Sequence, residues 1–158
     1  MMHLNPLHLL IGLVILALTH ELGHVISAKF LKLRIFSVGI AKSPYPHPFV
    51  KVEHSNVLWK RHLFFYSGAG MTLVLFLTSY FVGILDYRMI YFAFAVEFII
   101  EFNPFYSDFI LVNAKTQRDY YVFNTSFDGG KKYLLLFWII LIVVLLHPKG
   151  LQMWLNLV

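Results

Sequence analysis

The chain has 158 residues, of which 59% are hydrophobic and only 13% are charged. A soluble domain carries about a quarter charged residues, so this composition excludes an ordinary soluble domain and indicates an integral membrane protein. The absence of cysteine excludes thiolate metal sites, cysteine nucleophiles and disulfides. The net charge of +5 does not indicate a nucleic-acid partner, because the basic residues flank apolar runs and form no separate basic domain.

Four apolar segments approach the length of about 20 residues that a helix needs to cross a bilayer. They cover residues 7–30, 63–85, 89–112 and 133–146. The fourth is short, but lysines before it and the apolar segment 151–158 after it extend its reach. The first run lacks the basic start and small-residue cleavage site of a signal peptide, so we expect it to be a retained span.

The connection after the first span has the pattern of a β-hairpin. In RIFSVGIA (34–41), Phe36, Val38 and Ile40 alternate on one face, and FVKVEH (49–54) alternates in the same way. Between these stretches, KSPYPHP carries three prolines, which is a turn signal. We therefore predict an all-α integral membrane protein of about four transmembrane helices, with a small cytoplasmic-side β-hairpin between the first and second.

Charge predicts how these spans are oriented. Most of the 13 basic residues lie in the connections 29–61 and 113–132, and positive loops stay on the cytoplasmic side. We expect both termini outside and both connections inside, in the cell membrane. The chain is then a single domain over residues 1–158, with a core at 7–112 and an accessory fourth span at about 133–157.

The first span contains the motif THELGH (19–24). His20 and His24 are four residues apart, so on a helix their rings lie on one face and can occupy two positions on one metal ion. Glu21 lies about 100° further round, where its carboxylate can act on a water molecule without ligating the metal. Ionisable groups at mid-bilayer cost about 2.5–3.5 kcal/mol each, so this span needs a compensating partner such as a metal.

The third span supplies candidates for a third ligand. Glu97, Glu101 and Asp108 would share one face of a continuous helix, and we interpret the two glutamates as cavity-lining residues or spare ligands. Pro104 lacks an N–H group and clashes with the preceding turn, so the helix should kink or unwind near Asn103. Irregular backbone at membrane depth is tolerated only against protein or a wet cavity. This face should therefore point inward.

The motif HELGH in one span and NPFYSD (103–108) in a later one resemble the site-2 protease family of intramembrane zinc metalloproteases. The hairpin after the motif span and SGAG (67–70) at the start of the next span agree with this resemblance. It implies that His20, His24 and Asp108 ligate one zinc ion per chain and that Glu21 activates the water that attacks a peptide bond. Asn103 would help to shape the substrate cleft. The implied substrate is a membrane-embedded or membrane-adjacent segment of a protein or peptide.

The chain also departs from the family pattern. Phe109 follows Asp108 where the family usually has glycine, and Asp128, in FNTSFDGGKK (123–132), is a rival third ligand. These departures keep an alternative open, a catalytically silent metal-binding membrane protein that binds or masks a membrane partner. Gly68 and Gly70 are interpreted as helix-packing residues and not as catalytic ones.

Overall fold

The computed structural model describes residues 6–41, 47–83, 87–103, 108–112, 116 and 129–146. These residues are mostly helical and include one two-stranded antiparallel sheet. In chain order the elements are α1 (Pro6–Phe30), β1 (Ile35–Ala41), β2 (His47–Val52), α2 (Leu58–Val82), α3 (Tyr87–Glu101), α4 (Asp108–Leu111) and α5 (Gly129–Leu146). The prediction of a mainly helical protein with a hairpin between the first two long helices is confirmed.

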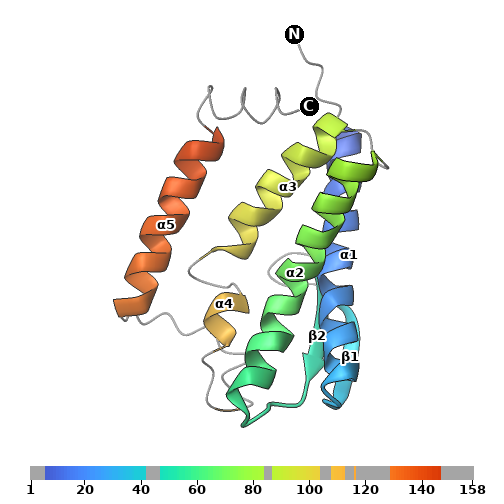
Figure 1. Ribbon diagram of the computed structural model, residues 1–158, viewed down its shortest axis with the longest axis vertical. Helices are drawn as coiled ribbons and strands as arrows, with labels where there is room; N and C mark the ends of the chain where they lie inside the picture. The colour runs from blue at the N-terminus through green and yellow to red at the C-terminus, as the bar shows by residue number, and fades with distance from the viewer. Residues whose placement is uncertain are drawn as a thin grey trace.

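The helices form a loose bundle in which α1 and α2 lie side by side (Figure 1). Helix α3 packs against both of them, and α5 stands on the far side of α3, which it contacts. The short helix α4 lies beyond the end of α3 and packs against α2. This arrangement brings α1, α2 and α4 together at the lower half of the bundle, beside the hairpin (Figure 1).

Two described helices, α1 and α2, are long and apolar enough to cross a membrane by length and composition. Helix α5 contains a shorter apolar segment, Tyr133–Val144. Helix α2 begins at Leu58, before the apolar run that starts at residue 63. Its first turn is therefore helical although it carries charged residues. In that turn the ammonium group of Lys60 donates to the carbonyl of Leu31, 3.3 Å away.

The third apolar segment is broken where the proline predicts a break. Helix α3 ends at Glu101 and α4 begins at Asp108, so the segment is not one continuous helix. The amide of Asn103 donates to the carbonyl of Ile100, 3.1 Å away, in the tightened last turn. Pro104, Asp128 and the segment after residue 146 lie outside the described residues.

The hairpin lies beside the lower half of the bundle, where β2 contacts α1 (Figure 1). Ile35 pairs with Val52 and Ile40 with Pro48, with an irregularity between Ile35 and Ser37. Val52 is buried in a cluster that also contains residues of α1, α2 and the end of α4. The alternate side chains predicted to share one face of β1 are exposed, and they are Phe36, Val38 and Ile40.

Candidate metal centre

His20 and His24 lie on one face of α1, as their spacing predicts. Helix α1 is anchored by Leu16 and Ala28, which are buried against the neighbouring elements above and below the histidines. The side chains of His20 and His24 are 15% and 6% exposed. Their rings meet edge to face with centroids 4.8 Å apart, so both imidazoles enter the same small volume.

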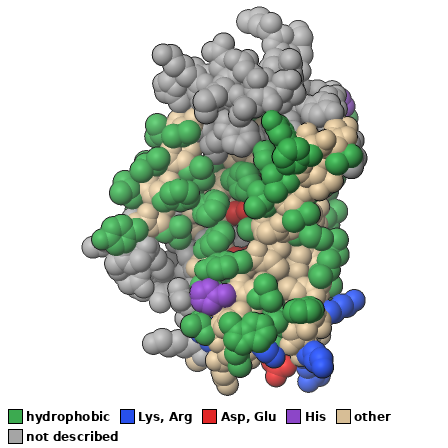
Figure 2. Space-filling view, viewed as in Figure 1, with side chains coloured by type: hydrophobic (Ala, Val, Ile, Leu, Met, Phe, Trp, Pro, Cys, Tyr) green, Lys and Arg blue, Asp and Glu red, His purple; other side chains and the backbone are tan. Residues whose placement is uncertain are grey.

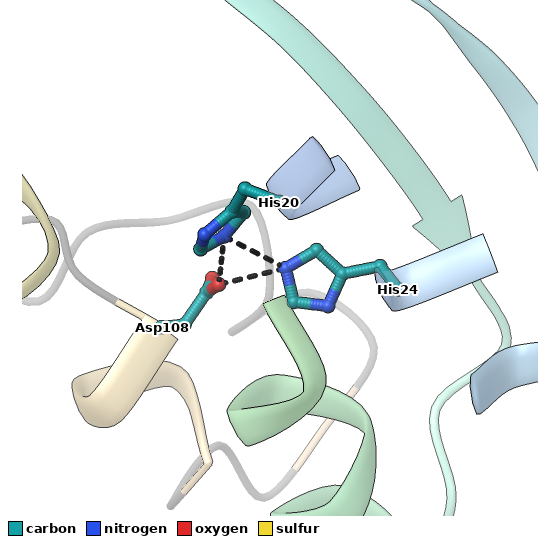
Figure 3. Close-up of side chains that lie close together, drawn as sticks. All are labelled: His20, His24 and Asp108. Atoms are coloured by element: carbon teal, nitrogen blue, oxygen red, sulfur yellow. Dashed lines mark hydrogen bonds and ion pairs between the residues drawn. The ribbon is translucent and has the colours of Figure 1, made fainter. Parts of the chain in front are cut away.

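Asp108, the first residue of α4, completes a triangle with these two rings (Figure 3). Its Oδ2 atom lies 3.0 Å from Nε2 of His20 and 2.8 Å from Nε2 of His24. The two Nε2 atoms are themselves 3.0 Å apart. The structure therefore brings together the three side chains that the sequence predicts as metal ligands, from positions 84 and 88 residues apart along the chain.

The second nitrogen of each imidazole faces an acceptor. Nδ1 of His20 lies 2.8 Å from Oε1 of Glu101, and Nδ1 of His24 lies 2.9 Å from the carbonyl oxygen of Phe64. A carboxylate and a carbonyl only accept, so each Nδ1 carries a hydrogen. When the rings are neutral, both Nε2 atoms present lone pairs toward Asp108. This is the tautomer that a metal-ligating histidine needs.

The donor set fits a zinc ion. When both rings are neutral, the three converging atoms are all acceptors and repel one another, and a shared cation relieves that repulsion. Two imidazole nitrogens and one carboxylate oxygen form a ligand set known from catalytic zinc sites. Tetrahedral zinc with ligand distances near 2.0–2.1 Å separates its ligand atoms by about 3.3 Å. The observed separations of 2.8–3.0 Å need only a slight widening.

Two glycines allow α1 and α2 to approach closely at the site. A Cβ atom added to Gly23 would meet the carbonyl oxygen of Ser67 and would lie 2.9 Å from Cβ of Met71. A Cβ atom added to Gly68 would meet Nε2 of His20 and would lie 2.7 Å from Nε2 of His24. Gly68 therefore has the packing role predicted for it. The same prediction is wrong for Gly70, because a Cβ atom there would meet none of the described residues within 4 Å.

Hydrogen bonds reinforce this helix crossing. Ser67 donates to the hydroxyl of Ser27 over 2.8 Å, and Ser27 in turn donates to the backbone carbonyl of His24 over 3.0 Å. Small polar residues at such a crossing satisfy one another where water is excluded. The link connects α2 directly to the turn of α1 that carries the second histidine.

Helix α4 is held in place from two sides. The guanidinium group of Arg61 donates to the carbonyl of Val112 at the end of α4, 3.1 Å away, and to the carbonyl of Ser55, 3.2 Å away. The ring of Phe109 stacks on Phe102 with centroids 4.8 Å apart and an interplanar angle of 13°. Because Phe109 is adjacent to Asp108, these contacts orient the turn that carries the third predicted ligand.

Helix α5 supports the break that precedes α4. The indole N–H of Trp138 donates to the carbonyl of Ile99, 2.6 Å away. That carbonyl would normally accept from residue 103, but the amide of Asn103 bonds to Ile100 instead. Phe137 also meets Phe102 edge to face, with centroids 5.3 Å apart. The predicted accessory span thus satisfies a backbone group that the break would otherwise leave unpaired.

The remaining predicted residues are Glu21 and Asn103. Glu21 is half-buried and close enough to interact electrostatically with His20, His24 and Asp108. Asn103 is buried at the end of α3, two residues beyond Glu101. Among the described residues, Glu21 is not part of a group whose ligand atoms converge, consistent with a residue that does not ligate.

A second group of possible ligand atoms consists of His20, Glu97 and Glu101, which all lie within 4.8 Å of one another. Both glutamates are buried.

The bundle surface is apolar around a hollow between α5 and α2, and acidic atoms are visible in the hollow (Figure 2). Basic side chains gather instead at the lower end of the molecule (Figure 2).

No protein-family model, curated protein or solved structure matches this chain.

Proposed function

We propose that this chain is an intramembrane zinc endopeptidase of the site-2 protease kind. The observation that carries the proposal is the convergence of Nε2 of His20, Nε2 of His24 and Oδ2 of Asp108 within 2.8–3.0 Å of one another. It is supported by the apolar helices that bear these groups, because ionisable side chains in a membrane span are costly and mark functional sites.

Zinc held by these three residues would supply Lewis-acid polarisation of the scissile carbonyl and would make water a stronger nucleophile. Glu21 is the general base of the proposal. Its carboxylate accepts a proton from the attacking water and delivers it to the leaving amine as the peptide C–N bond breaks. No proton is gained or lost over the cycle, so Glu21 returns to its starting state.

The proposed substrate is a membrane-embedded or membrane-adjacent segment that becomes extended at the site. A helical peptide bond is shielded by its own hydrogen bonds, so the segment must unwind before attack. The hairpin supports this step, because β1 pairs with β2 along one edge and an extended peptide can add as a strand to a sheet edge. Asn103, which is buried just after α3, contributes to the shape of the proposed cleft.

The proposed orientation places both termini outside and the zinc in the cytoplasmic half of the bilayer. The motif ends close to Lys29 and the basic connection that follows it, and such connections remain in the cytoplasm. Reporter fusions test this orientation. A reporter inserted in residues 113–132 should report the cytoplasm and one after Val158 the outside. A cytoplasmic signal at Val158 would mean that the fourth segment does not cross.

Substitution of Glu21 by glutamine tests the function itself. The variant should keep its zinc, because the replaced group does not ligate, but lose cleavage by at least about 10²–10⁴-fold. The assay uses the purified chain in lipid vesicles with a library of single-span peptides, and mass spectrometry detects the products. Cleavage by Glu21→Gln at the parent rate would refute the protease mechanism. Zinc binding with no cleavage by the parent would favour the alternative of a silent metal-binding protein.

A further inference from the structure

Glu101 has a position that neither the motif nor the proposed chemistry explains. It is the last residue of α3, 81 residues from His20 in the chain, and its Oε1 atom lies 2.8 Å from Nδ1 of His20. The side chain of Glu101 is only 4% exposed. A carboxylate is rarely buried this deeply unless it is paired, so its partner on α1 is the physical reason for its placement.

The two imidazoles at the centre are oriented by different partners. His24 donates its Nδ1 hydrogen to a neutral backbone carbonyl, that of Phe64, whereas His20 donates to the carboxylate of Glu101. A hydrogen bond to an ionised acceptor is roughly twice as strong as one between neutral groups. It also makes Nε2 a more basic ligand by favouring positive charge on the ring. His20 is thus the ligand whose orientation and basicity depend on a side chain.

The second oxygen of the Glu101 carboxylate also indicates that this residue has a role in the site. Oε2 of Glu101 is buried and has no hydrogen-bond partner among the described residues. A buried polar atom without a partner destabilises the folded chain. A glutamate at this position therefore destabilises the folded state, and its hydrogen bond with His20 offsets only part of that cost. Its presence there indicates a role in the site.

We propose that Glu101 is a positioning residue that sets the zinc affinity of the chain by holding His20 through Nδ1. This inference rests on the proposed zinc centre but makes a separate claim. Glu101 does not ligate the metal. It fixes the tautomer and the ring plane of His20 and links α1 to the end of α3, just before the break that leads to Asp108.

Glu97 provides the matched control. It lies one turn earlier on the same helix and is buried to a similar extent, since the whole residue is 7% exposed against 6% for the whole of Glu101. Its carboxylate is near His20, but the hydrogen bond described from His20 goes to Glu101. A general effect of removing a buried acid near the site should appear in both variants. An effect of positioning should appear only at Glu101.

The experiment measures zinc affinity by competition with a chromogenic chelator, using the full chain in detergent. Glu101→Ala should bind zinc about 10–100-fold more weakly than the parent, and Glu97→Ala should stay close to the parent. Glu101→Gln retains an acceptor for the Nδ1 hydrogen but not the charge, so it should recover part of the loss. The visible spectrum of the cobalt-substituted chain should change in the Glu101 variants and not in Glu97→Ala.

Several outcomes would overturn the inference. The inference is wrong if Glu101→Ala binds zinc as tightly as the parent. If the alanine variant does not fold, the inference is wrong if Glu101→Gln binds zinc as tightly as the parent. Equal losses at Glu97 and Glu101 would overturn it as well. Two zinc ions per parent chain, with one lost on substitution of Glu101, would identify it as a direct ligand. A parent chain that binds no zinc would overturn the proposed function and this inference together, which distinguishes the two failures.

Discussion

Replacing Gly68 by alanine places a methyl group among the ligand atoms of the candidate metal centre. The added Cβ would meet Nε2 of His20 and would lie 2.6 Å from Cε1 of His20 and 2.7 Å from Nε2 of His24. Comfortable contacts to carbon begin near 3.5 Å, so the rings would have to retreat by about 1 Å. Zinc sites hold their ligand distances within about 0.2 Å, so the triangle should not survive this displacement unchanged.

The magnitude follows from the cost of overpacking. Extra methyl groups in a packed site cost about 1–3 kcal/mol, and strain of that size borne by the ligands lowers zinc affinity about 5- to 150-fold. Gly70→Ala is the matched control, since its added Cβ meets no atom within 4 Å in the part of the chain that the structure describes and alanine favours a helix over glycine. Chelator competition on both purified variants measures the difference. A folded Gly68→Ala variant with parent-like zinc affinity would refute this reading of the site.

Two further predictions concern the groups that complete the centre. Asp108→Ala should lose most of its zinc and all activity while Asp128→Ala stays close to the parent, and the reverse pattern in metal analysis would move the site to the start of the fourth span. Trp138→Phe leaves the carbonyl of Ile99 without the donor it has now, and thermal unfolding in detergent should show a loss of about 1–3 kcal/mol. An unchanged melting temperature would mean that α5 does not support the break.

Local patterns located most elements but placed the ends of several of them two to five residues away from where the structure has them. Periodicity and length located α1 within one residue of the first apolar run, because a helix that is apolar all round leaves little ambiguity. Alternation and the proline-rich turn located the hairpin. The apolar run placed the start of α2 too late, since hydrophobicity marks the membrane part of a helix and not its polar first turn at Lys60 and Arg61.

The site was predictable where its chemistry depends on spacing within one element. The four-residue interval between His20 and His24 requires a shared face on any helix, and the proline before Asp108 signals the break that frees that residue to turn inward. Glu101 was interpreted only as a lining residue or spare ligand, because its partner is 81 residues away and a contact of that range leaves no periodic signal.

The contacts of Arg61 and Trp138 also join residues far apart in the chain, so the sequence does not reveal them. In the sequence, the basic residues indicate only membrane topology, and no pattern singles out Trp138. In the structure, Arg61 donates to the end of α4 and Trp138 donates to the end of α3. Both bonds go to backbone carbonyls, which every residue carries, so no pairing of side-chain types could have revealed them.

The central claim is that His20, His24 and Asp108 hold one zinc ion. X-ray absorption at the zinc edge, on the chain purified in detergent without added metal, tests it most directly. The claim predicts one zinc per chain with two imidazole nitrogens among ligands at about 2.0–2.1 Å, and the loss of one imidazole from the spectrum in His24→Ala. A parent chain without zinc, or a zinc spectrum that lacks imidazole ligands, would contradict it.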